Sequence, residues 1–172
     1  NIFLLYGKPL FVWSYLAAKK SGLFNKIYVS TENDIYIKLC EENGIDYIKR
    51  QLNLADDLTL KQEVIVNVKK SLDQRGEYYD QYMSLQANSP DITSEDLKKI
   101  VHRLEFYKRW EVVTVDKNLN QNGVARLMLN KVVEMKSLSA VLGVEIIDRS
   151  NIHTIEDIRN LERTWNPQNT NT

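Results

Sequence analysis

The chain has 172 residues, of which 43% are hydrophobic and 27% are charged, and its 23 basic residues balance its 23 acidic residues. Length and composition predict a single domain with a true core, because a chain of this size buries about two thirds of its unfolded surface. The zero formal charge argues against a general nucleic-acid binder, which would normally be basic, so an anionic ligand would have to be held by local groups.

Cysteine content and apolar runs indicate the compartment. Cys40 is the single cysteine, so an internal disulfide cannot form, which favours a reducing compartment. The longest apolar runs, such as Ile2–Tyr6, are too short to span a bilayer, and no signal peptide is visible. We therefore expect a cytoplasmic protein with no membrane partner.

Helical and strand-like patterns alternate along the chain. Helices with amphipathic spacing and with caps or glycines at their ends are predicted over residues 11–21, 34–44, 59–72, 94–107 and 154–163. Short strands rich in β-branched and aromatic residues are predicted over residues 26–31, 45–48, 79–86, 111–115 and 141–147. This alternation predicts an α/β fold of the three-layer, doubly wound, Rossmann-like class with a mostly parallel sheet.

The domain organisation follows from composition. No internal repeat, low-complexity run or linker divides the chain, so residues 1–164 are predicted to form one domain and residues 165–172 a polar tail. The stretch from Asp116 to Gly123 is irregular and rich in asparagine. We expect it to begin an excursion from the core over residues 118–141.

Common catalytic signatures are absent from the sequence. It contains no Gly-x-Ser-x-Gly elbow, no Gly-x-Gly-x-x-Gly fingerprint and no P-loop. His102 and His153 lack the spacing of zinc ligands, and His102 is interpreted as a residue of a helix face. Cys40 is interpreted as a small buried residue rather than a nucleophile.

Polar residues gather where strands of a parallel sheet would end, which is where ligands bind in such folds. The segments are Gly7–Leu10, Val29–Asp34, Arg50–Asp57 and Leu85–Pro90. Taken singly, each could be an ordinary turn or helix cap. Their amides and hydroxyls are also groups that recognise base edges and sugar hydroxyls.

In this order the segments resemble one family, the cytidylyltransferases that activate acidic sugars, of the acylneuraminate (CMP-sialic acid synthetase) type. That family reads Lys-Asn-Ile, Gly-Lys-Pro-Leu, Val-Ser-Thr-Asp, Arg-Pro-x-x-Leu-Ala-x-Asp and Leu-Gln-Pro-Thr-Ser-Pro. The matching segments here are Asn1-Ile2, Gly7–Leu10, Val29–Thr31, Arg50 with Leu54–Asp57, Leu85–Pro90, Thr93–Leu97, Asn122-Gly123 and Ile152–Ile158.

The resemblance implies a nucleotide-diphospho-sugar transferase fold and the transfer of CMP from CTP to the anomeric hydroxyl of a 2-keto sugar acid, a sialic-acid-like nonulosonic acid, with release of pyrophosphate. Mg²⁺ is the implied cofactor, and a homodimer formed through residues 118–141 is the implied assembly. Nucleotide-binding residues would be Asn1, Arg50, Thr59 and Gln86. Substrate-binding residues would be Gln86, Asn88, Ser89 and Asn122, and the metal would lie near Asp157 and His153.

Three differences from the family pattern qualify this picture. The family's loop Ala-Arg-x-Gly-Ser-Lys precedes the residue that matches Asn1, so we expect the first strand and the catalytic groups to lie upstream of this sequence, which by itself should not catalyse. Asn151 and His153 stand where the family commonly carries two aspartates for Mg²⁺. Ala87, Asn88 and Asp91-Ile92 replace Pro, Thr and Leu-Arg, which suggests another acidic sugar or reduced activity.

Two alternatives therefore stay open beside the sugar-acid cytidylyltransferase. One is a non-catalytic homologue that binds a nucleotide or a partner through the same groove. The other is a nucleotidyltransferase that uses a different base or sugar.

Overall fold

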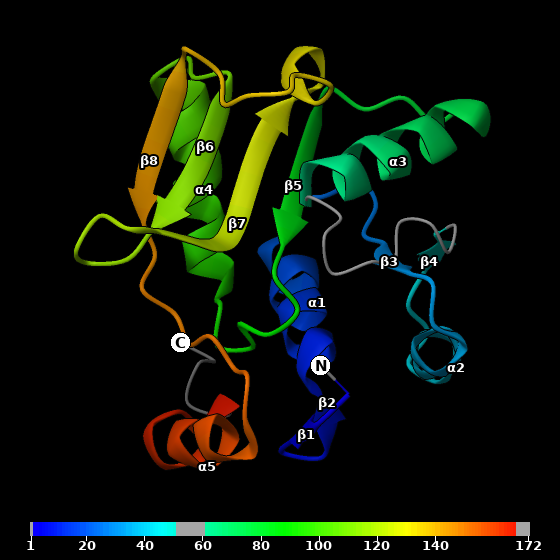
Figure 1. Cartoon of the computed structure of the whole chain (residues 1–172), viewed down its shortest axis with the longest axis vertical. Helices are drawn as coiled ribbons and strands as arrows, with labels where there is room; N and C mark the ends of the chain where they lie inside the picture. The colour runs from blue at the N-terminus through cyan, green and yellow to red at the C-terminus, as the bar shows by residue number, and fades with distance from the viewer. Residues whose placement is uncertain (1, 51–60, 168–172) are drawn as a thin grey trace.

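The structure is a computed structural model and describes residues 2–50 and 61–167. The helices are α1 (Leu10–Ser21), α2 (Asp34–Glu42), α3 (Lys61–Gln74), α4 (Ser94–Phe106) and α5 (Ile155–Thr164), with a short 3-10 turn η2 (Asn130–Val132). The strands are β1 (Leu4–Leu5), β2 (Lys8–Pro9), β3 (Val29–Thr31), β4 (Tyr47–Lys49), β5 (Gln81–Leu85), β6 (Glu111–Val115), β7 (Gln121–Leu129) and β8 (Leu142–Ile146). The α/β class is thus confirmed (Figure 1).

The largest sheet has the strand order β5-β7-β6-β8, and β3 and β4 form a separate parallel pair beside it (Figure 1). Strand β6 runs parallel to β8, whereas β7 is antiparallel to both β5 and β6. The sheet is therefore more mixed than the alternating sequence pattern predicts. The cause is the short β6–β7 turn, in which Asp116 accepts hydrogen bonds from the backbone N–H groups of Asn118 and Asn120 at 2.8 and 2.9 Å. A turn this short joins only antiparallel strands.

Strand β7 occupies part of the predicted excursion over residues 118–141. Val124, Ala125, Leu127 and Met128 are all buried, and β7 is an interior strand of the largest sheet, so this part of the segment belongs to the core. Dimer formation through the segment stays a prediction.

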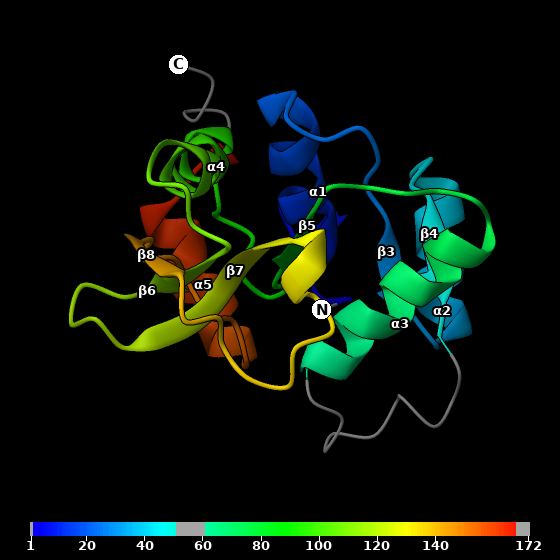
Figure 2. The same ribbon diagram turned by 90° about the horizontal axis from the view of Figure 1, so that it is seen from above.

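The two faces of the β5–β7 pair pack against different helices. Leu127 packs with Leu97, Ile100 and Leu104 of α4, and Ala18 of α1 belongs to the same cluster. Met128 points to the other face and packs with Ile65 and Leu72 of α3. Figure 2 shows α4 and α3 on opposite sides of β5 and β7. The arrangement gives the three layers expected of the class.

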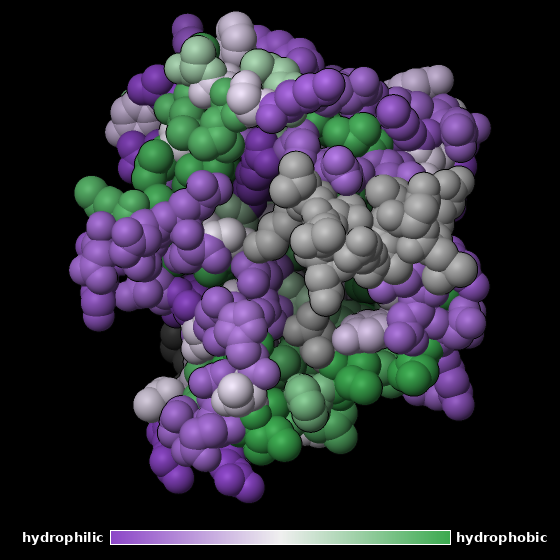
Figure 3. All heavy atoms as spheres, viewed as in Figure 1, coloured by the Kyte–Doolittle hydropathy of each residue, from purple (hydrophilic) through white to green (hydrophobic). Residues whose placement is uncertain are grey.

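Close packing of α4 on the sheet depends on Gly143 of β8. A Cβ atom at this position would lie 3.3 Å from Arg103 Cγ of α4 and 3.0 Å from Arg109 Cγ in the turn after α4. On the face away from α4, Val144 and Ile146 of the same strand remain 43% and 55% exposed, and Figure 3 shows apolar atoms over β8 there.

The predicted helix signals appear as expected. Thr93 and Asp96 form a reciprocal capping box at the start of α4, and Thr154 and Asp157 form another at α5. Gly22 ends α1 in the left-handed conformation at φ 67°, which favours glycine.

The structure agrees with the interpretations of Cys40 and His102. Cys40 is fully buried, and burial raises the pKa of its thiol, so it is a core residue rather than a nucleophile. His102 stacks on Phe106 along the surface of α4, with 5.1 Å between ring centroids.

Candidate functional site

The loops that follow β5 and β8 lie side by side and are joined by hydrogen bonds. The backbone N–H of Ile152 donates to the carbonyl of Asn88 at 2.9 Å. Asp91 accepts from the backbone N–H of Ser150 at 3.0 Å and from its hydroxyl at 2.9 Å. These bonds fix residues 86–92 and 147–152 as one rigid unit, which we call the loop pair.

A bidentate ion pair closes the loop pair at its helical end. Arg149 donates from Nε and Nη2 to the two carboxylate oxygens of Asp96 at 2.7 and 2.9 Å. Burial alone would raise the pKa of Asp96, but the hydrogen bonds from Arg149 and Thr93 outweigh it and hold that pKa below its usual value. Asp96 is therefore a structural anion and not a proton donor near neutral pH.

Three amide side chains meet at the centre of the loop pair. Asn151 Oδ1 accepts a hydrogen bond from Asn88 Nδ2 at 2.7 Å and another from Gln86 Nε2 at 3.3 Å. We call Gln86, Asn88 and Asn151 the amide cluster. The cluster joins two predicted site residues, Gln86 and Asn88, to Asn151. The sequence does not indicate this contact, because Asn151 is more than 60 positions away from both.

Buried polar atoms without a hydrogen-bond partner mark the same edge of the fold. In the described part of the chain they include Asn88 Oδ1 and Ser89 Oγ after β5, Arg50 Nε after β4 and Ser30 Oγ within β3. Asn88 and Ser89 are only 8% and 1% exposed. Since buried polar groups are nearly always paired, such a group calls for a ligand or a water. Three of these atoms lie just after the carboxyl ends of β4 and β5 and the fourth lies within β3, so we take this edge as the candidate site.

Arg50, predicted to bind the nucleotide, lies at this edge and is ion-paired with Glu32. Its Nη2 forms an ion pair with the carboxylate of Glu32, and its backbone N–H donates to the carbonyl of Thr31 at 2.9 Å. The two side chains are 18% and 24% exposed. Glu32 was seen in the sequence only as part of a polar strand exit, and nothing local in the sequence indicates this pairing.

Helix α1 connects the Arg50 region with the loop pair. The hydroxyl of Ser14 lies 3.4 and 3.3 Å from the carbonyl oxygens of Gln86 and Ser89. Ala87 packs in one apolar cluster with Phe11 of α1 and Val29 of β3. The relative position of the two polar groups is therefore set by α1.

Asn122, predicted to contact the sugar, is committed to structural bonds. Its Nδ2 donates to the carbonyl of Ile147 at 2.7 Å, and its Oδ1 accepts from Thr114 Oγ1 at 2.8 Å. The side chain thus holds the start of β7 against the beginning of the loop at 147–152. It borders the candidate site and helps to shape it.

The predicted metal-binding residues do not assemble a metal site in the residues that the structure describes. Asp157 accepts from the backbone N–H groups of His153 and Thr154 at 2.9 and 2.8 Å, and these bonds lower the pKa of its carboxyl. Within the described ranges no group of three His, Cys, Asp or Glu side chains could hold an ion. Mg²⁺ stays a prediction. Asn1 and Thr59 lie outside the described residues.

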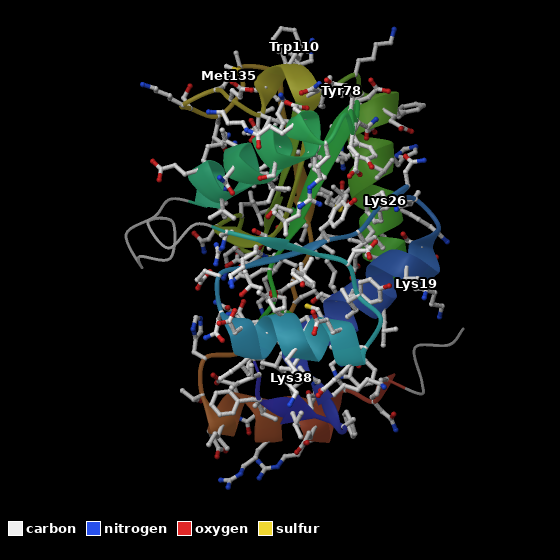
Figure 4. All side chains as sticks on the ribbon, turned by 90° about the vertical axis from the view of Figure 1, so that its right-hand side faces the viewer. Lys19, Lys26, Lys38, Tyr78, Trp110 and Met135 are labelled. Atoms are coloured by element: carbon white, nitrogen blue, oxygen red, sulfur yellow. The ribbon has the colours of Figure 1, made fainter. Side chains whose placement is uncertain are left out.

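Two other surface features lie away from this edge. A cavity of about 520 Å³ is lined by Tyr28, Glu41, Asp46, Tyr47 and Arg75, among others, at the amino ends of β3 and β4. Burial and a hydrogen bond to Glu77 raise the pKa of Tyr28 to about 12, so its phenol stays protonated. Exposed Tyr78, Trp110 and Met135 gather at one end of the molecule, far from Lys38 of α2 (Figure 4).

The fold is that of nucleotidyltransferases. A CMP:2-keto-3-deoxy-manno-octonic acid synthetase in complex with CTP superposes with a TM-score of 0.76 at 11% identity, over 95% of this chain and 90% of that one. A cytidylyltransferase from Leptospira borgpetersenii superposes with a TM-score of 0.69 at 14% identity, over 94% of this chain and 77% of that one.

Sequence comparison identifies the family. Residues 1–160 match the family model described as cytidylyltransferase, and the chain belongs to this family, which confirms the resemblance. It is 29% identical to an N-acylneuraminate cytidylyltransferase of Streptococcus agalactiae over 117 residues, 67% of this chain and 27% of that protein. It is also 29% identical to a pseudaminic acid cytidylyltransferase of Campylobacter jejuni over 100 residues, 58% of this chain and 43% of that protein. The chain thus spans less than half the length of these curated relatives. No helix among the described residues is long and apolar enough to cross a membrane.

Proposed function

We propose that the protein transfers CMP from CTP to the anomeric hydroxyl of a 2-keto sugar acid, a sialic-acid-like nonulosonic acid, and releases pyrophosphate. The observation that carries the proposal is the gathering of the amide cluster and the unpaired buried polar atoms near the carboxyl ends of β3, β4 and β5. The relatives named for N-acylneuraminate and pseudaminic acid support the substrate class.

The reaction exchanges one bond to phosphorus for another. The anomeric oxygen of the sugar bonds to the α-phosphorus of CTP, the bond from that phosphorus to the bridging oxygen breaks, pyrophosphate leaves, and the hydroxyl proton passes to solvent or a base. Such transfers depend on alignment and on electrostatic stabilisation of the phosphates. The described part of the chain supplies groups for both.

The proposed roles follow the position of each group. Arg50 would neutralise phosphate charge, and Gln86 would lie between nucleotide and sugar. Asn88 and Ser89 would present hydrogen-bonding groups to the sugar, while Asn122 would shape that side of the site. Asn1 and Thr59 are proposed to contact the nucleotide, and Mg²⁺ is the proposed cofactor.

The test is a pyrophosphate-release assay of the full-length protein with CTP, Mg²⁺ and a panel of sugar acids: N-acetylneuraminic, pseudaminic and 2-keto-3-deoxy-manno-octonic acid. Release with CTP and one acid, well above release with UTP, ATP or GTP, is expected. Arg50→Gln should raise KM for CTP at least tenfold, because hydrogen bonds to a charged group contribute about 1.5–3 kcal/mol. Arg159→Gln is the matched control, because Arg159 lies on α5 in an exposed ion pair with Glu156.

Two results would contradict the proposal: no release with any acid, or equal release from all four nucleotides. A second candidate is a non-catalytic nucleotide-binding homologue, which is favoured by Asn151 and His153 standing where the family commonly carries two aspartates. Calorimetry that detects CTP binding without turnover would support this second candidate.

A further inference from the structure

The positively charged side chain of Arg50 lies next to the negatively charged side chain of Glu32. Its Nη2 is ion-paired with Glu32, while its Nε is buried and makes no hydrogen bond in the described structure. A guanidinium has five N–H donors, so the ion pair leaves donors for a further ligand. The region is polar and partly buried.

The pairing of Glu32 with Arg50 is built into the backbone. Strands β3 and β4 are parallel, with Thr31 opposite Lys49, so that Glu32 and Arg50 each follow at the next position. The backbone N–H of Arg50 donates to the carbonyl of Thr31 at 2.9 Å and extends this register by one bond. The register of β3 and β4 therefore places Glu32 and Arg50 side by side.

The chain after Glu32 is also fixed. The Thr31 hydroxyl accepts a hydrogen bond from the backbone N–H of Asn33 at 3.2 Å. The Asn33 side chain in turn caps α2 by accepting from the backbone N–H of Ile35 at 2.8 Å. Glu32 thus lies between a strand end and a capped helix, and these bonds hold the backbone on either side of it.

An anion on Arg50 would lie within a few ångströms of the Glu32 carboxylate. Like charges at this separation repel, and partial burial reduces the screening by water. An adjacent ion pair from the same two segments, Lys49 with Asp34 at 2.7 Å, is balanced in charge and more exposed. The Glu32 carboxylate consequently limits the affinity of Arg50 for an anion.

We infer that Glu32 is an internal counter-ion that competes with the anionic ligand of Arg50 and so sets the affinity of the site for phosphate-bearing ligands. The inference rests on the proposed function in that CTP is taken as the natural ligand. The same charge repulsion would act on any polyphosphate bound at Arg50. Glu32 acts through Arg50, so it is a positioning and affinity-setting residue.

The test is isothermal titration calorimetry of the full-length protein and its variants with CTP, inorganic tripolyphosphate and cytidine. Glu32→Gln keeps a hydrogen-bond acceptor and removes the charge. It should tighten binding of CTP and tripolyphosphate about three- to tenfold and leave cytidine unchanged. In the Arg50→Gln background, Glu32→Gln should change affinity much less.

The matched control is Glu145→Gln. Glu145 is also paired with an arginine, Arg103, at 2.7 Å and is also largely buried, but it lies on β8 at the far edge of the largest sheet. This control changes the net charge equally and should leave CTP affinity unchanged. Melting temperatures of all variants establish that each one is folded.

Outcomes for the inference and for the proposed function can be told apart. Glu32→Gln binding tripolyphosphate no more tightly than wild type, or Glu145→Gln tightening it equally, would overturn the inference. Absence of anion binding in both wild type and Glu32→Gln would overturn it too. Tighter tripolyphosphate binding by Glu32→Gln, without CTP-dependent pyrophosphate release by wild type, would retain the inference and reject the proposed function.

Discussion

At the scale of single residues, the orientation of an amide is decided by its partners. Asn151 Oδ1 receives N–H groups from both Gln86 and Asn88, so the nitrogens of those two amides are committed to it. Asn88 Nδ2 also donates to the carbonyl of Ile152 at 3.2 Å, and its Oδ1 is left buried without a partner. Asn151 therefore determines which atoms the amide cluster can offer to a ligand.

We predict that Asn151→Ala lowers kcat/KM of the proposed reaction about tenfold or more, because a buried donor left unpaired costs about 1–3 kcal/mol. Asn151→Asp keeps the acceptor oxygen and should retain more activity than Asn151→Ala. Steady-state kinetics with CTP and the accepted sugar acid provide the measurement. Asn160→Ala, which removes an exposed amide of α5, is the control; full activity of Asn151→Ala would refute the assigned role.

At the scale of elements, the start of α4 is the point where a helix and the loop pair are locked together. Asp96 caps α4 through Thr93 and binds Arg149 at the same time, and its side chain is only 5% exposed. One carboxylate thus serves two elements. Removing it should affect both.

We predict that Asp96→Asn destabilises the fold by about 3 kcal/mol, the typical effect of removing one partner of a buried ion pair. The pKa of Asp96 is lowered in the folded state, so its contribution to stability is present above the unfolded pKa of about 3.9 and is lost as pH falls through the folded pKa. Denaturant titrations between pH 7 and pH 2 should show wild type losing stability below about pH 4 and the variant losing less.

The neighbouring Glu95→Gln is the control for this experiment. Its ion pair with Lys98 is exposed, with side chains 65% and 50% accessible, so the change should stay within about 0.5 kcal/mol. Equal stability of Asp96→Asn and wild type at pH 7 would contradict the assignment.

Helix α5 tests the metal prediction at the same scale. Since Asp157 caps this helix through His153 and Thr154, we expect Asp157→Asn to lower the melting temperature by the same amount with and without Mg²⁺. Differential scanning calorimetry in the two buffers is the measurement. A loss confined to the Mg²⁺ buffer would instead identify Asp157 as a metal ligand.

At the scale of the whole molecule, a buried ionic network joins elements on the sheet face opposite α4. Glu111 of β6, only 1% exposed, is paired with Arg126 of β7 and accepts the backbone N–H of Ser139 at 2.7 Å. Arg126 also donates to Gln62 of α3, whose amide donates to the carbonyl of Val133. The network ties α3 and the chain before β8 to the central strands.

We predict that Glu111→Ala destabilises the protein by about 3–5 kcal/mol, because it leaves the charge of Arg126 unpaired in a largely buried position. Glu111→Gln should cost less, since an amide oxygen can still accept. Urea denaturation gives both values. Glu134→Gln, which weakens a pair whose carboxylate is 56% exposed, should change stability by less than about 1 kcal/mol, and a similar loss in all three variants would argue against the network.

Much of the fold can be predicted from short-range patterns in the sequence. The capping box of Thr93 and Asp96 and the β-branched strand Glu111–Val115 depend on neighbours a few residues apart, and both were predicted at the correct positions. Ordered motifs likewise sufficed for the family, which the family model then confirmed. Short-range patterns carry this information because helix caps and strand periodicity are local properties of the chain.

Tertiary structure alone decided the rest. The start of strand β7 overlaps the asparagine-rich stretch from Asp116 to Gly123, so the sequence does not predict this strand. The burial of Arg126 within it depends on Glu111, which another strand supplies. Asn151 meets the amide cluster only because the loops after β5 and β8 run together, and Glu32 meets Arg50 only through the parallel register of β3 and β4. The sequence determined the family and the local helix and strand signals, whereas long-range pairing determined which polar groups at the candidate site are bonded to one another.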